Sequence, residues 1–283
     1  GSHERWLTTL THGGSLLLRD DSLWTAEQTY QAMQRYDVTV AAFPPAYLQQ
    51  LAEHAEQAGN PPAVRVYCFG GDAVPQASYD QARRALQPRY IINGYGPTET
   101  GVTPLLWKAA EGETCGAAYA PIGRCVGTRV GYVLDQDLNP LPVGAAGELY
   151  LGGEGLARGY LDRAGQSAER FVADPFGGPG GRLYRTGDLV RKRIDGIYDY
   201  LGRIDNQVKI RGFRIELGEI EASLRQAPTV TDAVVVAREG GSGKQLVAYV
   251  VATSSQATGL CEGLRAQLQQ SLPDYMVPAQ WVV

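Results

Sequence analysis

The segment most suited to chemistry is residues 93–100, which reads Asn-Gly-Tyr-Gly-Pro-Thr-Glu-Thr. The glycines that flank Tyr95 let the backbone approach a flat ligand, on which the tyrosine ring can stack. Thr98 can hydrogen-bond a phosphate oxygen, and Glu99 can hold Mg²⁺ through its carboxylate. Each part suits a nucleoside triphosphate, and the alternative reading of this string alone is a Gly-Pro turn with a polar rim.

Two further segments carry groups that suit the sugar and the phosphates of a nucleotide. Asp188 ends the string Tyr-Arg-Thr-Gly-Asp and can accept two hydrogen bonds from a ribose diol, although capping a turn is the commoner role of such an aspartate. Residues 203–214 hold four cations beside a glycine. These cations could face phosphates, and the alternative is the solvated edge of a hairpin.

The elements that must position these groups follow from the sequence pattern. Up to about residue 105, β-branched or aromatic runs alternate with helix-like runs, which predicts a parallel sheet covered by helices. These runs are residues 38–43, 46–57, 64–69, 75–86 and 90–93. The string that contains Tyr95 follows the last of these strands, and ligands of open α/β sheets bind beyond the carboxyl ends of the strands.

The pattern changes twice further along the chain. Between about 120 and 203 the helical periodicity disappears, which predicts a small antiparallel or barrel-like β-region. Its apolar runs are residues 131–134, 148–151, 182–184 and 198–201. From Gln207 onward the pattern predicts a separate α+β unit of about 75 residues. Its strands and helices are expected at residues 207–210, 217–224, 230–237, 246–252 and 260–268.

Composition excludes several classes of protein. The chain has 283 residues, 44% of them hydrophobic, so it can bury the core of one large or two modest domains. A net charge of −4 argues against a dedicated nucleic-acid binder, and the longest apolar stretch is far too short to span a membrane. The cysteines have no metal-ligand spacing, so neither a zinc site nor a disulfide frame is expected and a reduced, cytoplasmic setting is favoured.

The order and spacing of these strings resemble the adenylation domains of nonribosomal peptide synthetases. That family lies within the adenylate-forming superfamily that includes acyl-CoA synthetases and luciferases. Further matching strings are Gly-Glu-Leu-Tyr-Leu-Gly-Gly-Glu-Gly-Leu-Ala-Arg-Gly-Tyr at 147–160, Glu-Arg-Phe at 169–171 and Leu-Pro-Asp-Tyr-Met-Val-Pro at 272–278. The resemblance covers essentially the whole chain after residues 1–3, which are interpreted as the remnant of a purification tag.

The resemblance implies an α/β fold with two domains. Residues 4–204 would form the C-terminal part of the large adenylation core, with a flavodoxin-like parallel α/β subdomain at about 4–120 and a β-rich, barrel-like subdomain at about 121–204. Residues 205–283 would form a small, mobile and truncated α+β C-terminal domain.

The resemblance also assigns roles in binding the nucleotide. Tyr95 would stack on adenine, with Gly94 beside it, and Asn93 would pair with the adenine amino group. Thr98 and Glu99 would be the catalytic contacts to phosphate and to Mg²⁺.

Four residues further along the chain receive roles in the same way. Asp188 would bind the ribose, and Arg203 would be a neighbouring ribose or phosphate contact. Asp205 would be the hinge about which the small domain swings. Lys209 would lie on the loop that this swing brings to the active site for thiolation.

The substrate pocket implied by the resemblance is lined mostly by small residues, which predicts space for a long side chain. The positions are Ala42, Cys68, Gly70, Gly94, Val102 and Thr103. Glu4 is ambiguous, because one register makes it a pocket residue and the other a framework glutamate. In the pocket, its carboxylate would favour a basic amino acid such as lysine or ornithine; in the framework, a neutral substrate would be expected.

The implied reaction joins an amino acid to ATP, giving aminoacyl-AMP, and then transfers the aminoacyl group to a phosphopantetheine thiol on a peptidyl carrier protein domain. Neighbouring synthetase domains are implied partners, and the resemblance also allows an MbtH-like protein. The family's upstream phosphate loop and Phe-Asp signature, and its downstream Asn-Gly-Lys signature, are missing. The chain alone is therefore expected to be nearly inactive.

Two alternatives remain for the function. The first is an acyl or aryl acid–CoA ligase of the same superfamily. The second is a noncatalytic docking cassette.

Overall fold

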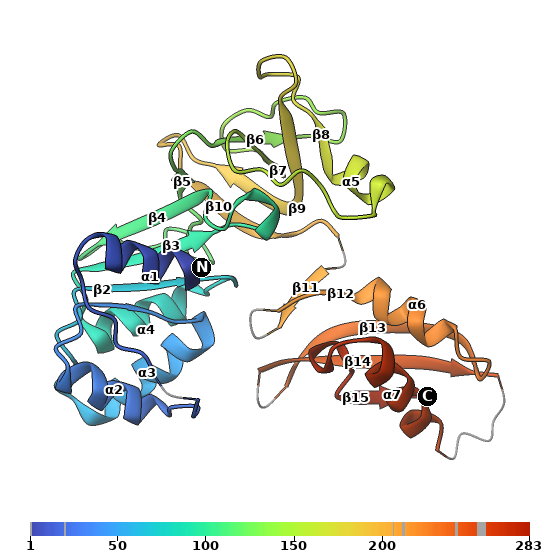
Figure 1. Ribbon diagram of the computed structural model, residues 1–283, viewed down its shortest axis with the longest axis horizontal. Coiled ribbons are helices and arrows are strands. Elements are labelled where there is room, and N and C mark those ends of the chain that lie inside the picture. The colour runs from blue at the N-terminus through green and yellow to red at the C-terminus, as the bar shows by residue number, and fades with distance from the viewer. Residues whose placement is uncertain (1, 20, 206, 211–212, 241–242, 254–258) are drawn as a thin grey trace. The chain divides into compact units, whose positions relative to one another are not determined.

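The computed structural model describes residues 2–19, 21–205, 207–210, 213–240, 243–253 and 259–283; of the side chains of residues 2–4, 239, 240 and 243 nothing is described. The chain divides into two compact units, Gly1–Ile204 and Asp205–Val283 (Figure 1). Each unit has its own hydrophobic core.

The first part of the first unit is a five-stranded sheet in the order β1-β2-β3-β4-β5. The pairs β1–β2 and β2–β3 are parallel, whereas β4 and β5 are added antiparallel. The predicted parallel sheet is therefore confirmed, and the sequence pattern missed the two antiparallel strands. The strands are β1 (Val40–Ala42), β2 (Val66–Gly70), β3 (Tyr90–Tyr95), β4 (Leu105–Ala110) and β5 (Arg124–Cys125).

Helices join the parallel strands as the alternating pattern predicted. α3 (Pro45–Ala58) begins with a proline, which lacks the N–H that a first helical turn leaves unpaired. Its buried residues follow helical spacing and lie in the same core cluster as those of α4 (Gln76–Leu86); they are Leu48, Leu51, Ala52 and Ala55. Two helices before β1 were not predicted: α1 (Ser2–Thr11) and α2 (Ala26–Arg35), the second of which starts with a capping box at Thr25.

The second part of the first unit is an antiparallel sheet in the order β10-β9-β7-β6, with β8 paired to β9. This confirms the predicted β-rich region. Its strands are β6 (Val130–Leu134), β7 (Ala146–Gly152), β8 (Phe171–Ala173), β9 (Arg182–Lys192) and β10 (Tyr198–Arg203), and α5 (Ala164–Arg170) precedes β8.

Among the described residues, an isolated β-bridge between Gly123 and Tyr198 connects the two sheets of the first unit. Gly123 has φ +90°, and a Cβ atom there would overlap the backbone of Leu106. Only glycine fits this crossing without strain, because it tolerates the positive φ and has no side chain.

The second unit begins with a hairpin of β11 (Gln207–Ile210) and β12 (Phe213–Glu216), followed by α6 (Leu217–Arg225). A three-stranded sheet then forms from β13 (Val230–Gly240), β14 (Gly243–Ala252) and β15 (Gln280–Val282). α7 (Leu260–Ser271) and the short 3₁₀ helix η2 (Asp274–Met276) lie between β14 and β15 in the chain. The residues expected to mark the two helical faces pack in one cluster: Leu217, Ile220, Leu224, Leu264 and Leu268 are buried, and Leu260 is partly buried against them.

None of the described helices combines the length and the apolar character that crossing a membrane requires.

Candidate functional site

β3 ends in the string that the sequence singled out. Side chains alternate along β3, so Asn93 and Tyr95 both point into the protein and are almost fully buried. The Asn93 amide donates a hydrogen bond to the backbone oxygen of Pro121 at 2.9 Å. The 3₁₀ helix η1 (Thr98–Thr100) follows, with Thr98 exposed and Glu99 half-buried.

Asp188 lies at the centre of the site, in β9, with only 3% of its surface exposed. The Tyr95 hydroxyl donates a hydrogen bond to Asp188 Oδ2, and Arg203 Nη1 donates to Oδ1 at 2.8 Å. Burial, and then the Asp188 charge, raise the pKa of Tyr95 well above its usual value, so the phenol stays protonated and remains a donor. The structure therefore brings together Tyr95, Asp188 and Arg203, which come from three strands.

An irregularity in the sheet holds Asp188 at this point. From Glu148 to Tyr150 the register moves two residues along β7, while on the facing β9 it moves four, from Leu189 to Arg185, so β9 contains two extra residues. Gly187, within this bulge, has φ +73°. The bulge turns the backbone out of the regular pleat just before Asp188.

A tyrosine that the sequence analysis did not assign contacts the predicted metal ligand. The Tyr160 hydroxyl donates to Glu99 Oε1 at 2.6 Å, and the Ala157 N–H donates to the Glu99 backbone oxygen at 2.8 Å. Burial, and then the hydrogen bond to Glu99, raise the pKa of Tyr160. Tyr160 ends the string at 147–160, and that place in a motif was the signal that could have identified it.

The donor set around Glu99 is compatible with a metal held partly by a ligand. Among the described residues no three His, Cys, Asp or Glu side chains cluster as a metal site. Mg²⁺ in nucleotide sites is commonly bound by one or two carboxylates together with substrate phosphates. A single carboxylate at Glu99, beside the exposed Thr98, fits that mode and does not fit a dedicated metal cage.

Most of the predicted pocket residues lie at the carboxyl ends of the parallel strands. Ala42 pairs with Cys68 across β1 and β2, and Gly70 pairs with Gly94 across β2 and β3. A Cβ atom on Gly94 would lie 3.2 Å from the Thr103 side chain, so Thr103 packs directly over this strand end.

Two other contacts complete this region. Val102 has φ +75°, a strained conformation for a β-branched residue, and its backbone oxygen leaves no room for a side chain at Gly96. The pKa of the buried Cys68 thiol is raised by burial and lowered to a smaller extent by the guanidinium of Arg5, on α1. Sequence reasoning missed Arg5, because the contact joins segments far apart in the chain.

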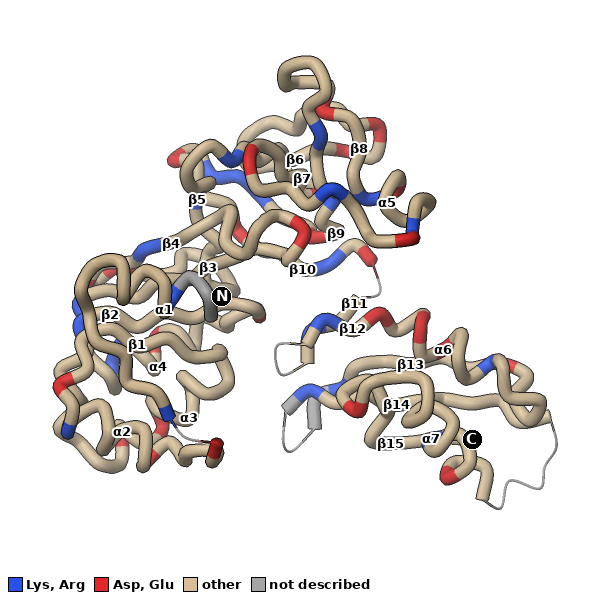
Figure 2. Tube along the Cα trace, in the orientation of Figure 1, with Lys and Arg blue, Asp and Glu red and all other residues tan. Residues whose placement is uncertain are grey.

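The remaining predicted residues lie elsewhere. The Glu4 side chain is outside the described residues. Asp205 is the first residue of the second unit, and its carboxylate accepts a hydrogen bond from the Gln207 N–H at 3.2 Å. Lys209 lies half-buried in β11, opposite Arg214 of β12. Figure 2 shows the cations that β11 and β12 carry.

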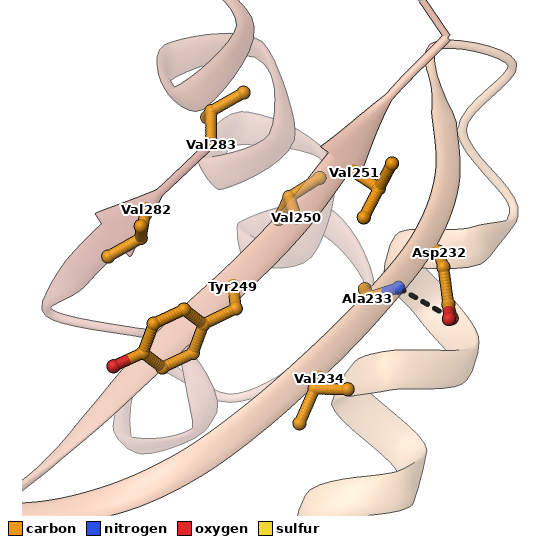
Figure 3. A pocket seen from close by; sticks show the side chains of 8 residues that line it. All are labelled: Asp232, Ala233, Val234, Tyr249, Val250, Val251, Val282 and Val283. Carbon is orange, nitrogen blue, oxygen red and sulfur yellow. Dashed lines mark hydrogen bonds between the residues drawn. The ribbon is translucent and has the colours of Figure 1, made fainter.

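The second unit has an apolar groove on its three-stranded sheet (Figure 3). It has a volume of about 260 Å³ and is lined mainly by valines and Tyr249. Its one carboxylate, on Asp232, accepts hydrogen bonds from the Ala233 N–H and from Arg225. None of the residues that line it is a cation, so this groove does not suit phosphates, and the nucleotide candidate is the site around Asp188.

Family models match most of the chain. The model described as "AMP-binding enzyme" matches residues 2–161, and the "AMP-binding enzyme C-terminal domain" matches residues 219–283.

Similar proteins point the same way. The chain is 44% identical over 280 residues to a dimodular nonribosomal peptide synthase of Bacillus subtilis, covering 96% of this chain and 12% of that protein. It is similar in structure to an artificially fused adenylation–PCP di-domain, NpsA-ThdA, from Klebsiella oxytoca, with a TM-score of 0.76, 26% identity and coverage of 95% of this chain and 49% of that one. The adenylation domain AlmE of Vibrio cholerae, solved with glycyl-adenosine-5′-phosphate, matches with a TM-score of 0.75 and 28% identity, covering 90% and 48%. The chain therefore spans a small part of the synthase and about half of each solved chain.

The contact between Tyr160 and Glu99 can be tested by removing one hydroxyl. Tyr160→Phe should lower the free energy of unfolding of the first unit by about 1–2 kcal/mol, because a half-buried carboxylate loses a donor. Urea unfolding followed through the buried Trp107 measures it. Tyr132→Phe is the matched control, since the Tyr132 hydroxyl makes no hydrogen bond with any residue that the structure describes. Equal stability of the two variants would mean that the contact contributes nothing.

Proposed function

This chain belongs to the AMP-binding enzyme family, and on that premise we propose that it is the nucleotide-binding part of an amino-acid-activating adenylation domain. The observation that carries the proposal is the meeting of Tyr95, Asp188 and Arg203 at one buried carboxylate. The proposed reaction has two steps. The amino acid carboxylate attacks the α-phosphorus of ATP and pyrophosphate leaves, and a thiol then attacks the aminoacyl carbonyl and AMP leaves.

The chain's own residues would bind and orient the nucleotide. Tyr95 would present its ring to adenine, with Asn93 near the adenine amino group. Asp188 would accept hydrogen bonds from the ribose hydroxyls, and Arg203 forms an ion pair with that carboxylate at 2.8 Å that fixes its direction.

Thr98 and Glu99 would lie beside the phosphates. The exposed Thr98 hydroxyl can donate to a phosphate oxygen, and the Tyr160 hydroxyl holds the Glu99 carboxylate in place. Mg²⁺, when held by Glu99 and the phosphates, would offset the negative charge of the pyrophosphate leaving group.

The proposed partners follow from the relatives. A di-domain that contains a carrier protein resembles this chain in fold, which supports a phosphopantetheine thiol as the acceptor and a carrier domain as the partner. We also propose neighbouring synthetase domains and an MbtH-like protein as partners. The proposed setting is cytoplasmic, and Lys209 is proposed to act in thiolation.

The proposed substrate is a basic amino acid, lysine or ornithine. The proposal depends on the Glu4 carboxylate lying in the pocket, where a cationic substrate would offset its charge. A second candidate comes from Arg5, whose guanidinium lies beside Cys68 and would favour an acidic substrate.

Removal of the stacking ring tests nucleotide binding. Tyr95→Ala should weaken the binding of ATP by roughly 1–3 kcal/mol, the range for loss of an aromatic stack on a base. Isothermal titration of ATP into this chain measures the effect. Tyr36→Ala makes the same change at a 56%-exposed position on the end of α2 and should bind ATP as the unmodified chain does. Equal affinity of Tyr95→Ala and Tyr36→Ala would remove Tyr95 from the site.

Restricting Asp205 tests the hinge. Asp205→Pro fixes φ at the boundary between the two units, so it should slow one half-reaction more than the other in an intact adenylation domain. Pyrophosphate exchange and thiolation are measured separately. Asp205→Ala is the control, because it removes the carboxylate but leaves the backbone free. If Asp205→Pro lowered both rates by the same factor, Asp205 would not be the hinge.

A panel of amino acids in pyrophosphate exchange, with an intact domain, tests the substrate. Lysine or ornithine should give the highest rate, and Glu4→Gln should lower that rate while leaving neutral amino acids unaffected. A preference for aspartate or glutamate that Arg5→Gln abolishes would replace the basic substrate by an acidic one. A clear preference for leucine or phenylalanine would contradict both.

A further inference from the structure

Glu148 is a buried carboxylate to which the proposed function assigns no role. It lies in β7, beside the bulge of β9, and its side chain is 7% exposed. Its Oε1 accepts a hydrogen bond from the Gly187 N–H at 2.9 Å, and its Oε2 accepts from Arg185 Nε at 3.0 Å. A buried carboxylate is costly unless donors surround it, so these contacts explain how β7 tolerates the charge.

The contact with Gly187 compensates for the bulge. Two extra residues in β9 interrupt the ladder between β7 and β9, and a backbone N–H in such an interruption has lost its regular partner. Glu148 supplies an acceptor from the facing strand. Because the acceptor is charged, the hydrogen bond is stronger than one between neutral groups.

A second side chain, that of Thr186, forms hydrogen bonds with the backbone on both strands at the same bulge. Thr186 Oγ1 donates to the Leu149 backbone oxygen at 2.7 Å and accepts from the Asp188 N–H at 3.0 Å. The N–H groups of Gly187 and Asp188 are thus both held by side chains. The direction in which the Asp188 carboxylate leaves the strand therefore depends on these two contacts, as well as on Tyr95 and Arg203.

We infer that Glu148 is a positioning residue for ribose recognition: it holds the Gly187 amide and thereby fixes the turn that presents Asp188. The inference rests on the proposed function only in naming ribose as the group that Asp188 binds. For this role, residue 148 needs an acceptor atom within hydrogen-bond distance of the Gly187 N–H. The ion pair with Arg185 helps β7 tolerate the buried charge, whereas the contact with the Gly187 N–H is the one that fixes the turn.

The test compares ATP with 2′,3′-dideoxy-ATP, which lacks the ribose diol. This chain should bind ATP about tenfold more tightly than the dideoxy compound, the size expected for hydrogen bonds to a charged acceptor. Glu148→Ala should remove most of that difference. The affinity for ATP should fall, and the affinity for dideoxy-ATP should stay within about twofold of that of the unmodified chain. Glu148→Gln, which keeps an acceptor for Gly187, and Arg185→Ala, which leaves Glu148 itself in place, should both keep the difference.

An equal loss of affinity for both nucleotides in Glu148→Ala would indicate general damage to the sheet and overturn the inference. An unchanged difference between the affinities for ATP and dideoxy-ATP would overturn it as well. If Glu148→Ala does not fold, Glu148→Asp replaces it, since its shorter side chain keeps the charge but withdraws the acceptor from Gly187. An undiminished difference in Glu148→Asp would also overturn it.

A second measurement separates this inference from the proposed function. Amide hydrogen exchange at Gly187 and Asp188 should be faster in Glu148→Ala than in Glu148→Gln, whether or not a nucleotide binds, while exchange in β6 stays unchanged. If the unmodified chain does not distinguish the two nucleotides, the proposed role of Asp188 fails. Exchange at Gly187 then decides the role of Glu148 alone, and unchanged exchange overturns it.

Discussion

The arrangement of the first unit depends on the hydrogen bonds that the buried carboxylate of Asp188 accepts. This carboxylate receives a hydrogen bond from Tyr95, at the end of the parallel sheet, and another from Arg203, at the end of the antiparallel sheet. A buried charge without donors is very costly, so the two sheets must meet where both donors reach it. The same requirement brings the nucleotide-binding candidates from separate segments into one site.

The backbone near this carboxylate departs from regular strand geometry at two places, in β9 before Asp188 and at Gly123. β9 accommodates two extra residues before Asp188, and the side chains of Glu148 and Thr186 satisfy the N–H groups that this leaves. The sheets cross at Gly123, where only glycine fits. Irregular backbone is tolerated in a buried region only when its polar groups find partners, and here they do.

In the predicted substrate region, the main constraint is the small space available for side chains at the strand ends. Gly70 and Gly94 pair in register; a Cβ atom at Gly70 would overlap the Gly94 backbone, and one at Gly94 would lie in tight contact with Thr103. Arg5 then places a cation beside Cys68. Small residues at the strand ends leave the backbone open to close approach there.

The sequence by itself predicted the parallel strands and their helices, the β-rich region and the faces of α6 and α7, because hydrophobic periodicity is a local property of the chain. Motif strings are local too, and they singled out Tyr95, Glu99 and Asp188 as candidates. The sequence pattern missed β5 and β15 because strands of two and three residues are too short to show a period. It missed β4 because Leu-Leu-Trp-Lys-Ala-Ala is almost entirely apolar, so hydrophobicity does not alternate along it although burial does. It also missed Tyr160, Arg5 and Glu148. Their roles arise from contacts with residues 39 or more positions away, and only the packing of the strands decides which distant donors meet a buried carboxylate.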